Sequence, residues 1–339
     1  MQPIRLGVIG LGLIWQREHQ PMLKTLSHVF EPVAFCDVSA ERRAATARDY
    51  PGALVVEDYR ALLERADVEA VLVLTPIAFN APVAMAALHA GKDVIMEKPL
   101  ARSVAEGQEL VATARRAGRR LFVAEQLAYR AADERLAAAI AAGEIGDLMF
   151  WNRIQHVDAD PAQGALRYDT TTWRKEPDYP LGALFDGGIH LIASLGSVFG
   201  PPASLFATGR QLRPEYGEYD HVVTLFHYAS GASGVLSHAT ALSPAQNLYH
   251  IHGSRGAIVV ERGCLLIDRG GQSPRRIELP NENPRVNLWQ AMVHAWQAGA
   301  EPAYNLERAL LDVAILEMVD RSIKSGQHMA VTREPDRVI

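Results

Sequence analysis

The sequence predicts an α/β protein with a doubly wound parallel sheet in its amino-terminal part. It also predicts a carboxyl-terminal α+β part with a large, mostly antiparallel open sheet. Three observations support this. Short apolar runs alternate with helix-like segments up to residue 125, a turn containing Gly10 and Gly12 follows the first run, and period-two runs joined by glycine-containing turns begin near residue 149. Strands that are apolar throughout are typical of parallel sheets with helices on both faces.

Length and composition agree with two domains, which we place at residues 1–125 and 126–339. The chain has 339 residues, 48% of them hydrophobic, enough to bury a core in each domain. Its formal charge of -5 lacks the basic excess that phosphate binding requires, so we expect no nucleic-acid partner. The two cysteines, Cys36 and Cys264, have neither a disulfide pattern nor a metal-ligand spacing, so we expect no metal.

The first domain is expected to contain five strands and five helices. The predicted strands are 4–9, 33–36, 70–74, 93–96 and 121–124, and the predicted helices are 14–30, 40–50, 59–65, 82–90 and 104–117. The uncharged run 70–90 is long enough to resemble a membrane span, but Pro76, Asn80 and Pro82 interrupt it. We therefore expect no contact with a membrane and a cytoplasmic location.

The second domain is expected to begin with an alanine-rich helix, 131–142, which ends at Gly143. The strands predicted after it are 149–157, 204–210, 221–228, 232–240, 248–252, 257–261 and 264–268. The helices predicted around these strands are 189–199, 288–298 and 306–325.

Gly10 and Gly12 follow a strand and precede a helix, a context in which the backbone turns tightly and approaches a pyrophosphate. Asp37 ends the second apolar run, where its carboxylate can accept hydrogen bonds from a ribose diol and repel a 2′-phosphate. These residues favour NAD as the cofactor. The alternatives are an ordinary tight turn for the glycines and helix capping for Asp37. Trp15 replaces the usual third small residue, and we expect it to point elsewhere, over the cofactor.

Arg42 and Arg43 follow Asp37 closely and could soften that preference, so NADP remains the alternative cofactor. Both arginines are also compatible with solvated positions on a helix.

Two further motifs follow directly after predicted strands: Thr75-Pro76 and Glu97-Lys98-Pro99. Ligands of open α/β sheets bind at the carboxyl ends of the strands, which predicts Lys98 beside a nicotinamide. A lysine there can hold a substrate hydroxyl and assist its deprotonation. The alternative is a surface lysine paired with Glu97, and a cis bond before Pro99 would fix its direction.

Asp186 and His190 are four residues apart and share one face if the segment is helical. A histidine with a neighbouring carboxylate suits proton transfer from an alcohol. From spacing alone, an Asp186 cap on the helix 189–199 with a packed His190 explains the pattern better.

The order of these motifs resembles the Gfo/Idh/MocA family of glucose-fructose oxidoreductase and inositol dehydrogenase relatives. Further landmarks of the resemblance are Gly143-Glu144-Ile145-Gly146, Trp173-Arg174 and Gly253-Ser254-Arg255-Gly256. The resemblance implies a Rossmann domain followed by a domain whose open sheet forms a homodimer or homotetramer. It also implies NAD(P)-dependent hydride transfer at a secondary hydroxyl or ketone of a sugar, cyclitol or related polyol.

The resemblance implies specific roles for single residues. The catalytic group comprises Lys98, Asp186 and His190. The cofactor positions are Gly10, Gly12, Leu13, Ile14, Asp37, Thr75, Pro76, Asn80, Glu97 and Lys98. The expected substrate-binding residues are Lys98, Tyr129, Trp173, Arg174, Asp186 and His190, and Arg153, His156 and Tyr168 are further candidates because aromatic faces and guanidinium groups suit sugar rings.

Three positions depart from the family pattern: Trp15, Asn80 where a histidine is common, and Ala128 where an arginine is common. Two other functions remain open. Some relatives in this superfamily are NAD-dependent glycoside hydrolases, and the same fold serves in regulators that sense a nucleotide without catalysis.

Overall fold

The computed structural model describes residues 2–158, 171–175, 178–182, 184–214, 217–271 and 273–331. The chain forms two compact units. The first combines Met1–Glu125 with Leu288–Val313, and the second combines Gln126–Asn287 with Ala314–Ile339. The predicted second domain includes everything beyond residue 125. In the structure, residues 288–313 belong to the first unit.

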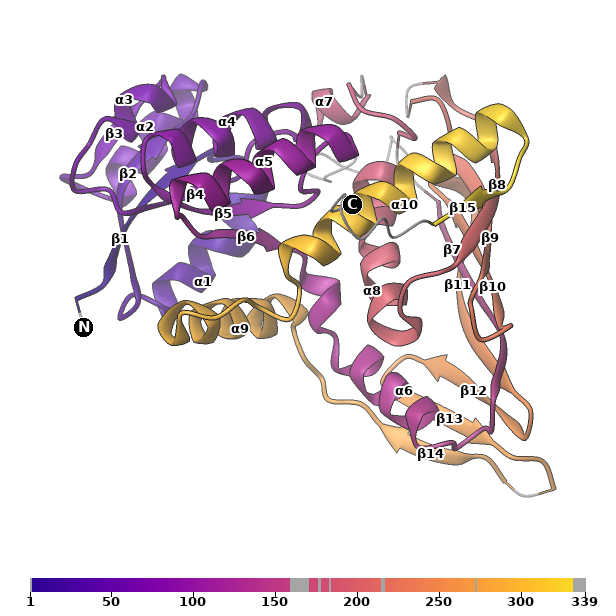
Figure 1. The fold of residues 1–339 in the computed structure, drawn as a ribbon. Coiled ribbons are helices and arrows are strands. Elements are labelled where there is room, and N and C mark those ends of the chain that lie inside the picture. The colour runs from indigo at the N-terminus through magenta and orange to yellow at the C-terminus, as the bar shows by residue number, and fades with distance from the viewer. Residues whose placement is uncertain are drawn as a thin grey trace. The chain divides into compact units, whose positions relative to one another are not determined.

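The first unit is built on a six-stranded parallel sheet with the strand order β3-β2-β1-β4-β5-β6 (Figure 1). The predicted parallel sheet is thereby confirmed. The order reverses between β1 and β4, which makes this pair the switch point where doubly wound sheets bind ligands. The strands are β1 Ile4–Ile9, β2 Phe30–Cys36, β3 Leu54–Val56, β4 Ala70–Val73, β5 Asp93–Glu97 and β6 Leu121–Ala124.

The helices of this unit depart from prediction at two places. The expected helix 14–30 is a π-helix, Trp15–His19, followed by a short α-helix, and the helix expected from Pro82 begins earlier, at Ile77. It passes through Pro82 although proline cannot donate its helical hydrogen bond. The α-helices are α1 Gln20–Thr25, α2 Ala40–Asp49, α3 Tyr59–Leu63, α4 Ile77–His89 and α5 Val104–Ala117.

Aromatic packing explains why the later segment 288–313 belongs to the first unit. Trp289 lies edge-on to Phe30 with 5.7 Å between ring centroids. Trp296 contacts the same ring at 5.8 Å and Phe122 at 5.6 Å. Burial of large aromatic side chains is a dominant source of stability, so α9 Pro284–Ala298 is held in this unit from Leu288 onward. The chain leaves the unit within α10 Leu306–Ser325.

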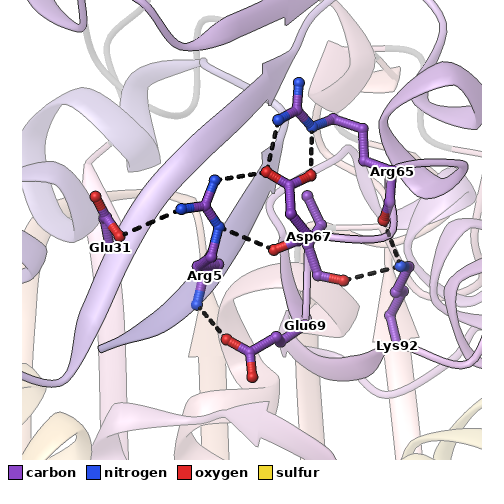
Figure 2. A network of polar contacts seen from close by, with 7 residues as sticks. Arg5, Glu31, Arg65, Asp67, Glu69 and Lys92 are labelled. Atoms are coloured by element: carbon purple, nitrogen blue, oxygen red, sulfur yellow. Dashed lines mark hydrogen bonds and ion pairs between the residues drawn. The ribbon is translucent and has the colours of Figure 1, made fainter. Parts of the chain in front are cut away.

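A network of ion pairs and hydrogen bonds links the amino ends of strands in the six-stranded sheet, which we call its amino edge (Figure 2). The Asp67 carboxylate accepts from Arg5 at 2.5 Å and from Arg65 at 2.6 Å, and these guanidinium groups hold its pKa well below the usual value. The ammonium of Lys92 donates to the carbonyl oxygens of Arg65 at 2.7 Å and Val68 at 2.8 Å. The network therefore ties the starts of β1, β4 and β5 together.

The second unit contains a nine-stranded sheet with the order β14-β13-β12-β11-β7-β10-β9-β8-β15 (Figure 1). All its neighbouring strands are antiparallel except β7 and β10, which confirms the mostly antiparallel sheet. The strands are β7 Leu148–Asp158, β8 Ser204–Arg210, β9 His221–His227, β10 Ser233–Ala239, β11 Ala241–Gly253, β12 Gly256–Glu261, β13 Cys264–Asp268, β14 Arg275–Glu278 and β15 Met329–Ala330.

The helical elements of this unit are the 3-10 helix Gln126–Tyr129, α6 Ala131–Ala141, α7 Thr172–Lys175, the π-helix Leu184–Gly188 and α8 Ile189–Phe199. Gly143 lies just after α6 with a φ of 69°, as the C′ prediction requires. Trp151 on β7 stacks on Phe199 of α8 with 5.1 Å between ring centroids, which closes the core between sheet and helix. None of the helices in the described ranges has the length and apolarity needed to cross a membrane.

Candidate active site

Gly10 lies at the switch point of the six-stranded sheet, directly after β1. Its φ is 99°, and a Cβ built on it would stand 2.5 Å from the Leu74 carbonyl oxygen that follows β4. The position therefore requires glycine both for its conformation and for the close approach of two chain segments. At Gly12 the nearest atom to such a Cβ is Arg42 Nη1 at 3.8 Å, an ordinary van der Waals distance, so this position is not crowded. Leu13 and Ile14, half-buried, begin the helical segment that follows.

The Asp37 carboxylate is buried at the end of β2 and holds the glycine turn. Oδ2 accepts a hydrogen bond from the backbone N–H of Leu11 at 2.7 Å, and Oδ1 accepts one from Ser39 at 2.8 Å. The N-cap of α2 is Ser39 and not Asp37, which removes the capping alternative. Arg42 Nη1 lies 3.5 Å from Asp37 Oδ2. The carboxyl ends of β1 and β2 thus bring Asp37 together with the glycine turn and Arg42.

The Arg43 side chain does not contact the Asp37 carboxylate in the way that Arg42 does. Its Nη1 donates to the carbonyl oxygens of Asp37 and Val38, and its Nη2 pairs with Glu57 at 2.8 Å. Trp15 is also withdrawn: its ring is 2% exposed and packs against Phe35 and Tyr50. The expectation that Trp15 lies over the cofactor is wrong, because the large side chain is accommodated inside the core.

A second group of predicted residues lies after β4 and β5. The Thr75 hydroxyl donates to Asn80 Oδ1 at 2.8 Å, and Asn80 Nδ2 donates to the Glu97 carbonyl oxygen at 3.2 Å. Asn80 is 1% exposed, so its amide bridges the ends of two strands, and Pro76 is the N-cap of α4 between them. Lys98 follows Glu97 at this edge, and the expected cis bond to Pro99 is present.

The sequence analysis missed His19 as part of this group. Its Nε2 lies 2.9 Å from Glu97 Oε1, and both side chains are buried. Glu97 Oε2 also accepts from the backbone N–H of Lys98 at 3.2 Å. The contact joins residues 78 positions apart, and no local motif marks His19. The carboxylate before Lys98 is therefore fixed by a histidine from the helix after the glycine turn.

In the second unit the structure brings three predicted residues together. Arg174 Nε donates to Asp186 Oδ2 at 2.5 Å, and the Arg174 guanidinium lies over the Trp173 ring at 3.9 Å. Asp186 belongs to the π-helix that precedes α8. The N-cap of α8 is Gly188, so the alternative that Asp186 caps this helix is wrong. His190 is half-buried at the second position of α8.

The remaining substrate candidates have the following contacts, or lie outside the described residues. Tyr129 is half-buried in the 3-10 helix, and its carbonyl oxygen accepts from Asn287 at 3.0 Å. His156 on β7 contacts the Ser237 hydroxyl at 2.8 Å. Arg153 is buried and donates to Ser194 at 2.8 Å. Tyr168 lies outside the described residues.

Comparison with known proteins places both units in one family. Residues 4–125 match the model of the "Oxidoreductase family, NAD-binding Rossmann fold", and residues 134–259 match that of the "GFO/IDH/MocA C-terminal domain". NAD is the cofactor that this family binds.

Two curated relatives and one crystal structure show how far the similarity extends. The dTDP-3,4-didehydro-2,6-dideoxy-alpha-D-glucose 3-reductase of Actinomadura kijaniata is 32% identical over 77% of this chain and 75% of its own length. Its counterpart from Streptomyces violaceoruber is 29% identical over 100% of this chain and 94% of its own. An oxidoreductase from Thermotoga maritima superposes with a TM-score of 0.89 at 27% identity, covering 97% of this chain and 98% of that one. These matches agree with the glycine turn after β1 and with Glu97-Lys98-Pro99 at the end of β5. The chain therefore belongs to the GFO/IDH/MocA family of oxidoreductases.

Proposed function

We propose that this enzyme is an NAD(P)-dependent oxidoreductase of a secondary hydroxyl or ketone in a sugar, cyclitol or related polyol. The observation that carries the proposal is the position of Lys98 directly after β5, at the edge where Gly10 and Thr75 flank the switch point. Relatives named as reductases of a dTDP-linked keto sugar support the substrate class. Catalytic roles of single residues are part of the proposal.

The residues of the first unit fit a dinucleotide. A Cβ at Gly12 would meet no atom closer than Arg42 Nη1 at 3.8 Å, and without that Cβ a pyrophosphate could approach the amides at the start of the following helix. Asp37 suits the ribose hydroxyls of NAD, while Arg42, 46% exposed, offers a guanidinium to a 2′-phosphate. Leu13, Ile14, Thr75 and Pro76 would line the cofactor, with Asn80 and Glu97 positioning that lining. When bound, the nicotinamide supplies the hydride donor or acceptor.

Proton transfer is assigned to this chain's own side chains. Lys98 would hydrogen-bond the substrate oxygen and stabilise its negative charge through its ammonium. His190 would take up the hydroxyl proton in oxidation and return it in reduction. Asp186 would hold Arg174 over Trp173, and with Tyr129 this pair would present charged and aromatic surfaces to a polyol.

The test is nicotinamide absorbance over time, with NAD and NADP separately, against inositols, aldoses, amino sugars, sugar acids and nucleotide-linked keto sugars. We expect turnover with at least one polyol or its ketone, faster with NAD(H) because Asp37 repels a 2′-phosphate. Release of a sugar from a glycoside without net change in nicotinamide would replace the proposal with a hydrolase. Nucleotide binding without turnover of any compound would favour a sensor.

We also propose that the protein forms a homo-oligomer through the nine-stranded sheet. One face of the sheet carries the half-buried apolar side chains of Ile154, Val223, Leu225 and Val235, which lie across β7, β9 and β10 among polar neighbours such as Asn152 and Ser237. Exposed apolar patches of this kind favour association. Light scattering should give a dimer or tetramer mass that falls to the monomer mass in Leu225→Glu; a monomeric wild type would contradict the proposal.

A further inference from the structure

Histidines gather on one surface of the second unit. This surface is the face of the nine-stranded sheet that carries Leu225, and we call it the outer face. Side chains alternate between the two faces of a strand, so the register identifies the histidines that lie on it. They are His156 of β7, His221 and His227 of β9, and His250 and His252 of β11. His328, just before β15, contacts Phe206 of the same face with 5.2 Å between ring centroids. These five and His328 are half of the 12 histidines in the chain, a concentration that the proposed redox chemistry does not require.

Four of these histidines form two pairs that water can reach. The rings of His156 and His221 lie 5.9 Å apart, and both Nε2 atoms face the Ser237 hydroxyl, at 2.8 and 3.4 Å. The rings of His227 and His328 lie 5.8 Å apart. His328 is exposed and the other three are half-buried, so all four can exchange protons with solvent. Burial and the neighbouring His221 lower the pKa of His156, so a charge is already disfavoured at that pair within one copy.

The cross-strand neighbours of His221 and His227 on the outer face carry no negative charge. They are Arg210 and Ala239 beside His221, and Ser204 and Ser233 beside His227. Cross-strand neighbours are the side chains that interact most closely in a sheet. A proton taken up by either histidine therefore adds a positive charge that no acidic neighbour offsets, and Arg210 adds another of the same sign.

Other titratable residues lie close to these histidines in the chain. Asp220, which precedes His221, is 1% exposed, and its two oxygens accept backbone N–H groups at 2.8 and 2.6 Å. His238 is buried on the opposite face, where burial lowers its pKa to about 4. Asp158 ends β7, two residues after His156. The acidic residue beside His221 is thus engaged by the backbone, which leaves the charge of β9 uncompensated.

The far end of the outer face, formed by β12, β13 and β14, carries charges of both signs. They are Glu261, Asp268, Arg276 and Glu278. These strands adjoin β11, so their carboxylates can offset a charge on His250 or His252. The positive charge gained in acid is therefore concentrated around β9, where His221 and His227 lie.

We propose that mild acid dissociates the homo-oligomer, because protonated His221 and His227 repel the same surface of a second copy. This inference rests on the homo-oligomer proposed above. In a symmetric dimer both copies contribute the same surface, so a proton taken up by one copy is matched in the other. Histidine gains its charge in mildly acidic solution, and like charges repel more strongly where an interface excludes water. Association therefore favours the neutral imidazoles, and the oligomer weakens as the pH falls.

The test is sedimentation equilibrium of the full-length protein at about pH 7.5 and about pH 5.5. We expect the dissociation constant of the oligomer to rise about tenfold or more in acid, reversibly, and to rise less in about 0.5 M salt, which screens the repulsion. In the double variant His221→Gln with His227→Gln, the acid effect should be absent, because glutamine keeps a polar side chain but takes up no proton. His28→Gln is the matched control: His28 is an exposed histidine of the first unit, and this variant should respond to acid as the wild type does.

Two further readouts keep the result decisive. Circular dichroism should be the same at both pH values, which separates dissociation from acid unfolding. The salt dependence of the wild type needs no variant, so it remains informative if the double variant folds poorly. A wild type that is monomeric at about pH 7.5 would contradict the homo-oligomer itself. An oligomer equally strong at both pH values, or one that the double variant loses in acid as the wild type does, would overturn this inference alone.

Discussion

Lys92 and Lys98 stand at the two ends of the same strand, β5, and have different surroundings. Lys92, at the amino end, is 8% exposed, and its ammonium donates to two backbone carbonyl oxygens. Lys98, at the carboxyl end, follows a glutamate that His19 fixes in place. The amino edge holds the sheet together. The carboxyl edge is the one at which open α/β sheets bind ligands, and it is where we propose that Lys98 acts.

The carboxylates at the two edges repeat this contrast. At the amino edge, guanidinium groups lower the pKa of Asp67. On the other side, burial raises the pKa of Asp312 from 3.8 to about 7, with the charge of Glu125 after β6 contributing. Ion pairs at the first edge favour the charged form, whereas desolvation at the second disfavours it. The two edges should therefore respond to mutation and to pH in opposite ways.

The largest effect is expected from Lys98→Met. Removing the ammonium that hydrogen-bonds the substrate oxygen and stabilises its negative charge should lower kcat by about a thousandfold. The dissociation constant of NADH and the melting temperature should stay at their wild-type values, because the side chain is part of neither the nucleotide turn nor the core. Steady-state kinetics, calorimetry and thermal melting check the three quantities. A lower melting temperature with an unchanged kcat would give Lys98 the role assigned to Lys92.

Gly10→Ala should have the next largest effect. A Cβ 2.5 Å from the Leu74 carbonyl oxygen, at a φ of 99°, strains the junction of β1 and β4. We expect a stability loss of about 3 kcal/mol, measured by urea unfolding. Gly12→Ala is the matched control: it should melt normally yet bind NADH more weakly, since its Cβ would enter the space left for the pyrophosphate. Equal stability of the two variants would show that Gly10 is under no constraint.

Lys92→Met should reverse the pattern of Lys98→Met. The substitution keeps most of the buried aliphatic stem but removes the ammonium that donates to the carbonyl oxygens of Arg65 and Val68. We expect a loss of about 2 kcal/mol in the free energy of unfolding, with kcat unchanged. A fall in kcat at unchanged stability would mean that the amino edge also takes part in catalysis.

The smallest effect concerns pH. The folded state holds the Asp312 proton more tightly than the unfolded chain, so this carboxyl lowers stability as pH rises from 3.8 to about 7. Asp312→Asn should therefore raise the melting temperature more at neutral pH than at pH near 5. Asp67 acts oppositely, because its lowered pKa stabilises the fold above 3.8 and loses that contribution on acidification below it. Calorimetry across this range tests both signs.

Much of the fold can be predicted from local pattern. The ranges of β1, β6, α5 and α8 agree with the prediction residue by residue, because apolar runs and caps such as Ser103 mark them. The three-residue β3 and the largely exposed β14 lack this signal. No local pattern shows which sheet a helix packs against. The return of residues 288–313 to the first unit follows from Trp289 and Trp296, whose aromatic partners lie far away in the chain.

The candidate site divides in the same way. The glycine turn and Asp37 belong to one strand-helix-strand unit, so their spacing predicts that they lie at the same site. The hydrogen bond from Leu11 to Asp37 is not among the sequence-based predictions. His19–Glu97 and the bridging role of Asn80 depend on how separate segments meet, which sequence spacing does not encode. The Arg174–Asp186 pair joins α7 to a π-helix, an irregular element without a reliable sequence signal.

The measurement that tests the central contrast most directly is a single-turnover experiment. Lys92→Met and Lys98→Met are each saturated with cofactor, mixed with the best substrate from the panel, and followed by nicotinamide absorbance. We expect hydride transfer at the wild-type rate in Lys92→Met and about a thousandfold slower in Lys98→Met. Equal rates in the two variants would contradict the assignment of the chemistry to the carboxyl end of β5.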